Sequence, residues 1–554
     1  MFEDLTYEEL RRRANAPMPD GAVARLEAAG QRRRVAAGEV MYRSDDRDYP
    51  FVYVVSGAIE VRDPTGMVLG AMTPGQFTGE LALLLGQTSF SDCIITEPGE
   101  VIVAPQQEII ELVQLDPEIG DLLLETFAAR RLLLIQRHQG TLALVGPESA
   151  PALQRVVVYA ERNRIPYRWV DPGDPAQREK LPEAALDGRA AKVVVHGRHV
   201  LTEPTVAEVA RALGLDLTVA GDEPVDLIIA GAGPAGLSAA VYGASEGLTT
   251  VLLDDVAIGG QSASSSRIEN FLGFPTGVSG GDLAFRAELQ AVKFGARVAT
   301  PRRAQKLERS TAPGFYEVTL DDGARLRGRV VVIATGARYR RLGVADEERW
   351  QGAGLFYAAT ELEARACRGK EMLVVGGGNS AGQAAMFLAG RASRVRLVHR
   401  GRDLADSVSS YLVERLRHAA NVEIETGSQV VELIGDDRLS AVKIRGGDGL
   451  VRERDAGGLF VMIGADPCTG RLEGAVGLDS RGFVQTGEAC GDAAPQPFNV
   501  FQTTLPGVFA VGDVRSGSVK RVASAVGEGS VVVQAVHARL AALREAERRE
   551  PVTL

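Results

Sequence analysis

The chain has few cysteines, and none of them lies close in sequence to another. The four are Cys93, Cys367, Cys468 and Cys490. No pair has the short spacing that is typical of a zinc site or of a disulfide framework. We therefore predict neither a zinc site nor a disulfide framework. The scarcity of cysteines also favours a reducing compartment, so we expect the protein to be cytoplasmic.

The chain also lacks long apolar runs and an excess of positive charge. No stretch reaches the roughly 18 consecutive apolar residues of a membrane span, and "MFEDLTYEELRRR" lacks the apolar core of a signal peptide. The net charge is −10. Because nucleic acid and anionic membranes bind basic surfaces, we predict neither as a partner. Hydrophobic residues make up 45% of the 554 residues, which is ordinary for a globular protein of roughly three to four domains.

The first predicted domain covers residues 1–139. Between residues 21 and 105, apolar segments such as "FVYVVSGAIEVRD" alternate with Gly, Pro and Asp turns, which predicts a small all-β barrel or sandwich. From Gln106 to about Gln139 the apolar residues follow helical spacing.

The stretch "PGQFTGELALL" in this domain resembles the phosphate cassette of cyclic-nucleotide-binding domains. In that family an Arg that pairs with the cyclic phosphate follows the cassette. Here Ser89 takes its position, and no Arg or Lys lies between Glu80 and Ile95. We therefore favour a β-roll used for docking or dimerisation over one that binds a cyclic nucleotide.

Residues 140–218 form a second predicted domain. The segments "TLALVG", "PALQRVVVYAERN", "PYRWVD", "KVVVHGRHV" and "VAEVARALG" follow each other in an order that resembles a thioredoxin- or glutaredoxin-like fold. Lys192 stands where that family has a cis-proline. The family's dithiol position is taken by Gly146, Pro147, Glu148 and Ser149. We expect a structural or docking module without thiol exchange.

A dinucleotide-binding motif begins at Val225 in "VDLIIAGAGPAGLSAAVYGASEG". Gly231 allows the tight turn, Gly233 lets a pyrophosphate approach the backbone, and Gly236 lets helix and strand pack closely. The helix N-terminus then offers free N–H groups to phosphates. The next strand ends in Asp254, at the distance expected of an acidic ribose ligand.

This motif and four further stretches resemble low-molecular-weight thioredoxin reductase-like flavoproteins. The further stretches are "IGGQ", "RIENFLGFP", "VVVIATGA" and "GVFAVGDVRSGSVKRVASAVGEG". The resemblance implies FAD, with Asp513 on the ribityl chain, Asn270 near the ring, and a helix from about Arg521 directed at the pyrimidine edge. The family often has Gln where this chain has Val522. The implied FAD contacts are Gly231, Gly233, Pro234, Ala235, Gly236, Asp254, Gly259, Gly260, Gln261, Asn270, Ala334, Thr335, Gly336, Gly512, Asp513, Arg521, Val522 and Ala523.

A second motif, "EMLVVGGGNSAGQAAMFLAGRASRVRLVHRGRD", repeats strand, glycine turn, helix and strand. Its last strand ends in basic residues where NADH-binding proteins have a carboxylate, and cations there accommodate the 2′-phosphate of NADPH. We therefore favour NADPH over NADH, although Ala405 takes the place of a further Arg of the family. The residues predicted to contact this nucleotide are Gly376, Gly378, Asn379, Ser380, Ala381, His399, Arg400 and Arg402.

Together these motifs predict a multidomain fold: a cyclic-nucleotide-binding-like β-roll, a thioredoxin-like α/β domain, and two nested Rossmann-like domains. The FAD domain would comprise residues 224–342 and 466–554, with the NAD(P)H domain at residues 343–465 between them. The resemblance also implies a homodimer.

The redox cysteines of the resembled family are missing. In that family a Cys-x-x-Cys pair precedes "RGKE"; here the two alignments place it on Ala358 and Glu361 or on Ala359 and Leu362. Cys367 stands alone and cannot form an intramolecular disulfide. Glu361 is a candidate catalytic residue because it stands where a redox cysteine of the family faces the flavin ring, but an exposed helix acid is the simpler interpretation, and the catalytic residues stay unknown.

The leading hypothesis is an FAD-dependent NAD(P)H oxidoreductase that passes electrons from flavin to an external acceptor, a small molecule or a redox protein, without an internal dithiol. One alternative is a disulfide reductase that uses a partner's cysteines. The other is a flavin-based redox sensor or interaction platform.

Overall fold

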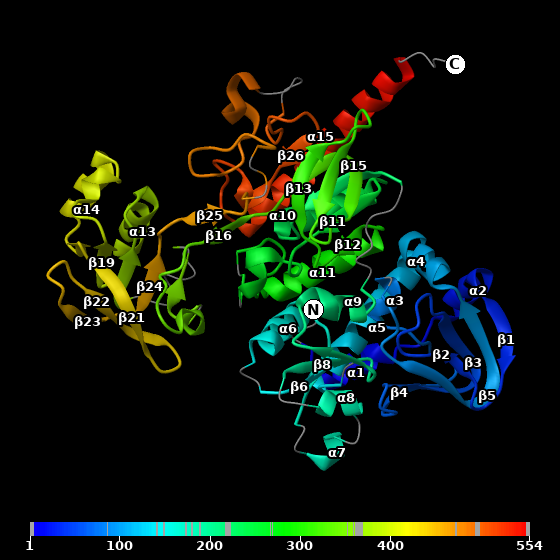
Figure 1. Ribbon diagram of the computed structural model, residues 1–554. Helices are drawn as coiled ribbons and strands as arrows, with labels where there is room; N and C mark the ends of the chain where they lie inside the picture. Colours follow the sequence, from blue (N-terminus) through cyan, green and yellow to red (C-terminus); the bar gives the residue numbers. More distant parts are fainter. Residues whose placement is uncertain are drawn as a thin grey trace. The chain divides into compact units, whose positions relative to one another are not determined.

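The computed structural model (Figure 1) describes most of the chain, and the described residues form two compact units. The first unit comprises Met1–Ser264, Ser279–Gly336 and Thr469–Leu554, and the second comprises Ser265–Val278 and Ala337–Cys468. The description covers residues 5–549 with gaps at 86, 140–141, 148–149, 172–173, 179–180, 188–189, 216–222, 266, 269, 352, 358, 360–368, 471, 473 and 494–498.

The N-terminal domain is an antiparallel β-roll with flanking helices, as predicted. Its strands pair in the order β1-β5-β3-β4, with β2 added to β5. Phe51, Phe77 and Phe127 lie fully buried between the sheet and α5. The elements are α1 (Tyr7–Ala14), α2 (Asp20–Ala29), β1 (Gln31–Val35), β2 (Val40–Tyr42), β3 (Phe51–Arg62), β4 (Val68–Met72), α3 (Leu81–Leu84), β5 (Asp92–Ala104), α4 (Gln106–Leu115) and α5 (Pro117–Gln136).

The second domain has the predicted thioredoxin-like topology, with strand order β7-β6-β8-β9. Strands β6 and β7 are parallel, and β8 and β9 are antiparallel to their neighbours. Thr205 and Glu208 form a capping box that begins α9. The elements are β6 (Leu142–Val145), α6 (Pro151–Arg162), β7 (Tyr167–Val170), α7 (Pro175–Arg178), α8 (Glu183–Leu186), β8 (Lys192–Val195), β9 (His199–Thr202) and α9 (Val206–Ala212).

A mixed sheet forms the core of the third domain, which completes the first unit. Strands β12, β11, β10, β15 and β26 are parallel, and β14 and β13 extend the sheet as an antiparallel meander. The inner strands are almost entirely apolar because helices cover both faces of such a sheet. The elements are β10 (Val225–Ala230), α10 (Pro234–Ser245), β11 (Thr250–Leu253), α11 (Gly280–Lys293), β12 (Arg297–Ala299), β13 (Ala304–Arg309), β14 (Tyr316–Leu320), β15 (Arg325–Ile333), β26 (Val508–Ala510) and α15 (Val522–Arg549).

The second unit has its own parallel sheet, in the order β17-β24-β18-β19-β20. At its centre the buried Arg396 of β19 pairs with Glu371 of β18 and Glu423 of β20, at 3.1 and 2.7 Å. The elements are β16 (Ala337–Tyr339), β17 (Leu355–Phe356), β18 (Glu371–Val375), α13 (Asn379–Ala389), β19 (Arg394–His399), α14 (Ser410–His418), β20 (Val422–Thr426), β21 (Gln429–Gly435), β22 (Leu439–Arg445), β23 (Val451–Asp455), β24 (Gly458–Val461) and β25 (Ala465–Pro467).

Within the first unit, the β8–β9 turn packs against the β-roll through a buried histidine. His196 Nδ1 lies 2.9 Å from Ser44 Oγ, and its Nε2 lies 3.4 Å from Thr88 Oγ1. Thr88 Oγ1 donates its proton to the Leu213 carbonyl, so we assign the ring proton to Nε2. Asp45 lies 3.9 Å from the same nitrogen.

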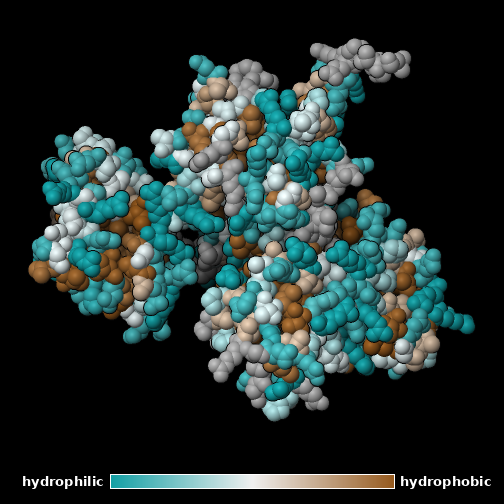
Figure 2. Space-filling model, in the orientation of Figure 1, coloured by the Kyte–Doolittle hydropathy of each residue, from teal (hydrophilic) through white to brown (hydrophobic). Residues whose placement is uncertain are grey.

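The surface drawn in Figure 2 is mainly hydrophilic, with separate smaller apolar patches. Across the described residues, no helix combines the length and the apolar character that crossing a bilayer requires.

The buried His196 should make stability depend on pH. Burial lowers its pKa from 6.5 to about 4, and Asp45 opposes this effect. The unfolded chain binds a proton at His196 more readily than the folded protein does. The contribution of neutral His196 to the stability of the folded protein is therefore complete above about pH 6.5 and is lost as pH falls towards 4. We expect His196→Gln to remove about 1 kcal/mol of the destabilisation seen between about pH 7.5 and about pH 5.5. Thermal midpoints at both pH values measure this. His418→Gln, at an exposed site on α14, is the control; equal pH dependence in wild type and His196→Gln would contradict the assignment.

Candidate dinucleotide sites

The first glycine loop joins β10 to α10 and requires glycine at two positions. Gly231 has φ 111°, and a Cβ there would overlap the Ala334 carbonyl oxygen. A Cβ on Gly236 would overlap the Gly231 carbonyl oxygen. Both positions exclude a side chain because strand, helix and the segment after β15 meet there.

Gly233 is different, because the space beside it is open. It is the N-cap of α10, with Pro234 as the first helical residue, and no described atom lies within 4 Å of an ideal Cβ. The N-terminal N–H groups of an α-helix have no partner within the helix. An open backbone surface at the positive end of a helix dipole fits a pyrophosphate.

Two other predicted FAD segments, at Gly259–Gly260 and at Gly512, contact this loop. Gly259 N donates to the Ala232 carbonyl at 2.7 Å. An ideal Cβ on Gly260 would lie 3.1 Å from the Gly233 Cα, and one on Gly512 would lie 2.9 Å from the Ala235 Cβ. The structure thus brings together segments that are up to about 280 residues apart in sequence.

The segment after β15 supplies a buried hydroxyl to the same region. Thr335 Oγ1 is buried and has no hydrogen-bond partner among the described residues, and Gly336 has φ 72° with open space at its Cβ position. A buried hydroxyl without a partner is costly, so these residues fit a site completed by a bound polar group.

Asp254 lies at the end of β11, as predicted, and its carboxylate holds the backbone of the loop. It accepts from Ala232 N at 2.8 Å, from Val256 N at 3.0 Å and from Ala257 N at 3.2 Å. Burial raises the pKa of Asp254, and these N–H groups lower it. A carboxylate has about four acceptor positions, so one remains for a ribose hydroxyl.

The last predicted FAD segment leads into α15, which begins at Val522 as expected. Asp513 is partly buried, and Arg521 and Ala523 are exposed. Burial raises the pKa of Asp513, with Lys520 opposing this effect and Glu528 adding to it.

Two further predicted FAD contacts are exposed. Asn270 is exposed in the segment Ser265–Val278, which belongs to the second unit. Gln261 lies in the first unit but is exposed.

The second glycine loop repeats the design between β18 and α13. Gly376 has φ 158°, and a Cβ there would overlap the Met462 carbonyl oxygen. Gly378 has no described atom within 4 Å of an ideal Cβ. Asn379 Oδ1 accepts from Ser409 N at 2.8 Å, while Ser380 is exposed and Ala381 is fully buried.

The basic residues after β19 divide into two environments. Arg400 and Arg402 are exposed, and neither forms an ion pair within the part of the chain that the structure describes. His399, which we predicted beside them, is only 8% exposed. Its ring fills the space beside Gly377 and Gly401, where any Cβ would overlap it. His399 therefore packs under the loop, and the two arginines are the exposed cations.

Two of the three described cysteines, Cys93 and Cys490, are poorly suited to redox chemistry. Cys93 is buried in the β-roll, which raises its pKa to about 12. Burial also raises the pKa of Cys490, whose Sγ lies 3.4 Å from the Gln485 carbonyl. Because the thiolate is the reactive form, both are disfavoured as nucleophiles. Most of the region of the missing dithiol lies outside the described residues, namely Ala358 and residues 360–368. These include Glu361 and Cys367.

The β-roll cassette contains two cations that the local sequence did not reveal. Arg131 of α5 pairs with Glu80 at 2.7 Å, and its side chain is 3% exposed. Arg130 donates to the Gly79 and Phe77 carbonyls at 2.7 and 2.9 Å. Ser89, at the position of the family's Arg, is buried and bonds to Ser91.

These contacts fill the cassette with the chain's own side chains. Its Glu80 carboxylate is neutralised by Arg131, and the thioredoxin-like domain covers it through His196 and through the Thr88 bond to Leu213. The signal that we missed was "AARRLLL", two arginines within an otherwise apolar helix.

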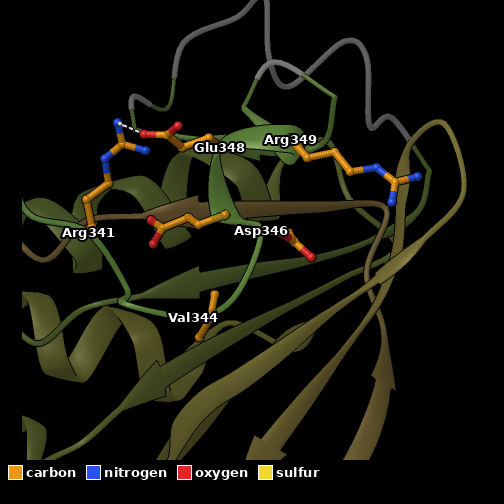
Figure 3. Close-up of a pocket in the computed structure, with 6 residues that line it drawn as sticks. Arg341, Val344, Asp346, Glu348 and Arg349 are labelled. Carbon is orange, nitrogen blue, oxygen red and sulfur yellow. Dashed lines mark ion pairs between the residues drawn. The ribbon is translucent and has the colours of Figure 1, made fainter. Parts of the chain in front are cut away.

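The second unit also contains a pocket of about 480 Å³ (Figure 3). Arg341 pairs with Glu348 at 3.5 Å across its rim, and Arg349 donates to the Asp436 carbonyl at 2.6 Å. Glu347 accepts from the main-chain N–H groups of Leu342 and Gly343, both at 3.0 Å. We assign the pocket no ligand. The lining residues are Arg341, Val344, Asp346, Glu347, Glu348 and Arg349.

Comparison with known families agrees with this geometry. The sequence profile of the pyridine nucleotide-disulphide oxidoreductase family matches residues 225–529, more than half of the chain. The chain belongs to this family. Members of its thioredoxin reductase-like branch bind FAD and NAD(P)H in general. The profile of the cyclic nucleotide-binding domain matches residues 32–116, which confirms the resemblance of the β-roll.

Relatives and solved structures support the same assignment. The chain is 31% identical to an alkyl hydroperoxide reductase protein of Xanthomonas campestris pv. phaseoli, over 63% of this chain and 67% of that protein. It is 31% identical to a thioredoxin reductase of Listeria innocua, over 60% of this chain and 99% of the relative. The crystal structure of thioredoxin reductase from Streptococcus pyogenes superposes with a TM-score of 0.51 at 32% identity, covering 58% of this chain and 100% of that one.

The open space at Gly233 gives a direct test of the first site. The backbone there (φ −72°, ψ −178°) is allowed for alanine, so we expect Gly233→Ala to change stability by about 1 kcal/mol or less. Its methyl group would occupy the space that we assign to the pyrophosphate. We expect FAD binding about tenfold weaker, measured by titrating apoprotein with FAD. Gly378→Ala, at the equivalent open position of the second loop, should leave FAD binding unchanged. Wild-type affinity in Gly233→Ala would show that FAD binds elsewhere.

Proposed function

We propose that the protein is an FAD-dependent NAD(P)H oxidoreductase that passes electrons from flavin to an external acceptor without an internal dithiol. The observation that carries the proposal is the convergence of the predicted FAD segments on the open backbone at Gly233. These segments follow strands that are neighbours in one sheet, and the crevice at the carboxyl ends of such strands is where dinucleotides bind in this type of fold. FAD, when bound, supplies the chemistry of accepting a hydride and passing on its electrons.

The residues of the first unit act by binding and orientation. The N-terminus of α10 would hold the pyrophosphate, and the remaining acceptor position of Asp254 would hold a ribose hydroxyl. Thr335 Oγ1 would gain the partner that it lacks among the described residues, and Asp513 would bind the ribityl chain. The N-terminus of α15 would face the pyrimidine edge of the ring, where its positive dipole end favours negative charge.

The second unit would bind the nicotinamide nucleotide at Gly378, and we propose NADPH as the preferred form. Arg400 and Arg402 are exposed beside the end of β19, where a 2′-phosphate is expected. A guanidinium that has no carboxylate partner is available for a charge-assisted bond to phosphate. The His399 ring packs between Gly377 of the glycine loop and Gly401, which lies between the two arginines.

The acceptor must lie outside the chain, because the sequence places no cysteine pair where the family has its dithiol. A redox protein or a small molecule would take the electrons from the flavin directly. A disulfide on a partner protein is a second candidate acceptor. The β-roll and thioredoxin-like domains would serve as docking modules, since side chains of the protein itself fill the cassette of the β-roll. We also propose that the protein is a homodimer.

The first test follows the flavin itself. Purified yellow protein, kept anaerobic, should lose its visible flavin absorbance rapidly on mixing with NADPH and more slowly with NADH. Added quinone, ferric complex or protein disulfide would then restore the absorbance and identify the acceptor class. A flavin that neither nucleotide bleaches would exclude the oxidoreductase proposal and favour a sensor or platform.

The second test addresses the nucleotide preference. Arg400→Ala and Arg402→Ala each remove a cation that we assign to the 2′-phosphate, so the KM for NADPH should rise about tenfold, equivalent to about 1.4 kcal/mol. The KM for NADH, which lacks this phosphate, should stay unchanged. Arg394→Ala is the matched control, because Arg394 is an exposed cation at the opposite end of β19. Equal changes for both nucleotides would contradict the assignment.

A further inference from the structure

Lys520 lies immediately before α15, beside residues that we propose for FAD, and the proposed function does not use it. Its Nζ donates to the Asp513 carbonyl and to Ser518 Oγ, both at 2.9 Å. The same nitrogen lies 4.7 Å from the centre of the Phe483 ring, within the range of a cation–π contact. These three contacts fix the position of the ammonium group. An ammonium has three N–H donors, and the described residues accept two of them.

The carboxylates near Lys520 do not cancel its charge by direct pairing. Glu528 is engaged by Arg515, at 2.6 Å, and by the Gly512 N–H at 2.7 Å. Asp513 binds Lys520 through its main-chain carbonyl rather than through its carboxylate.

The groups around Lys520 act on its pKa in opposite directions, and the pKa is lowered overall. Burial lowers its pKa; Asp513 and Glu528 raise it, and Arg481 and Arg515 lower it. Two nearby carboxylates therefore oppose the loss of the proton. The result is a partly buried, immobilised cation with one free N–H among the described residues.

Neither of the two residues that follow Lys520 provides a fixed positive charge. Val522 stands where the resembled family often has a Gln that bonds to the flavin ring, and valine offers no donor. Arg521 is exposed, so water screens its charge more strongly than that of Lys520. Of these three neighbours, Lys520 has the charge that is best held in place.

We infer that Lys520 supplies positive charge that stabilises the reduced flavin and so raises its reduction potential. This rests on the proposed function. The step is NAD(P)H + FAD → NAD(P)⁺ + FADH⁻, in which the flavin gains a hydride and one negative charge, and no proton is taken up from solvent. A fixed cation near the ring would interact more favourably with the reduced flavin than with the oxidised flavin, because the negative charge develops only on reduction.

The test is an anaerobic reductive titration of the holoenzyme against a reference dye. Lys520→Gln keeps a hydrogen-bonding side chain but removes the charge. At a fixed poise of the dye, we expect its ratio of reduced to oxidised flavin to be about tenfold lower than in wild type, which corresponds to about 30 mV for a two-electron couple. Lys520→Arg keeps the charge and should stay within about twofold of wild type. Sulfite, which forms an anionic adduct with oxidised flavin, should bind about tenfold more weakly to Lys520→Gln by absorbance titration, in proportion to the same charge effect.

Arg481→Met is the matched control. Arg481 lies over the same Phe483 ring, at 5.6 Å, but is exposed, so its removal should leave the potential and the sulfite affinity unchanged. A Lys520→Gln protein with wild-type potential and sulfite affinity would overturn the inference.

A measurement on the wild type keeps the test decisive even if a variant fails to fold. Reduction to FADH⁻ takes up one proton for two electrons, so the potential should fall by about 30 mV per pH unit near neutrality. A slope of about 60 mV, which means uptake of two protons, would leave no anionic flavin to stabilise and would also overturn the inference. Protein that contains no flavin at all would contradict the proposed function rather than the role of Lys520.

Discussion

The first site depends on the close approach of three backbone segments at the loop after β10. Gly231 and Gly236 have no room for a Cβ, because the carbonyl oxygens of Ala334 and Gly231 occupy that space. This approach lets α10 start directly above the end of the sheet. It also leaves the next glycine, Gly233, uncovered. Crowding at two glycines and open space at the third are therefore consequences of one geometry, and the open glycine is the one that we propose for the pyrophosphate.

The other predicted FAD segments depend on this loop for their position. Asp254 holds the loop and the following turn through main-chain N–H groups, so the acid has a structural role as well as a proposed binding role. The thioredoxin-like domain contributes too, because Arg162 donates to the Gly260 carbonyl at 3.1 Å and Asn163 to the Val256 carbonyl at 3.2 Å. A domain without its dithiol still contacts the loop that we assign to the cofactor.

The front half of the chain uses a ligand-binding fold as a packing surface. The Glu80 carboxylate pairs with the buried Arg131, and removing either partner would leave an uncompensated buried charge. Phe285 and Leu289 of α11 pack into the β-roll core. The β-roll, the thioredoxin-like domain and the third domain therefore share contacts within one unit, which is consistent with docking modules rather than independent binding domains.

The local sequence was sufficient for the repeating parts of the structure. The glycine spacing, the apolar strands and the start of α15 were all predicted because they follow from short-range geometry, and the profile match confirmed the family. The glycine spacing also indicated Gly233 and Gly378 as the positions for phosphate, and the structure shows open space at both. The sequence did not indicate that Arg131 would reach Glu80, that His399 would turn under its loop, or that Lys520 would be held by Phe483. Those contacts join residues that only folding brings together, and burial then changes their charge and availability. The sequence by itself determined the two dinucleotide loops, and the tertiary structure decided which of the charged residues remain free to meet a ligand.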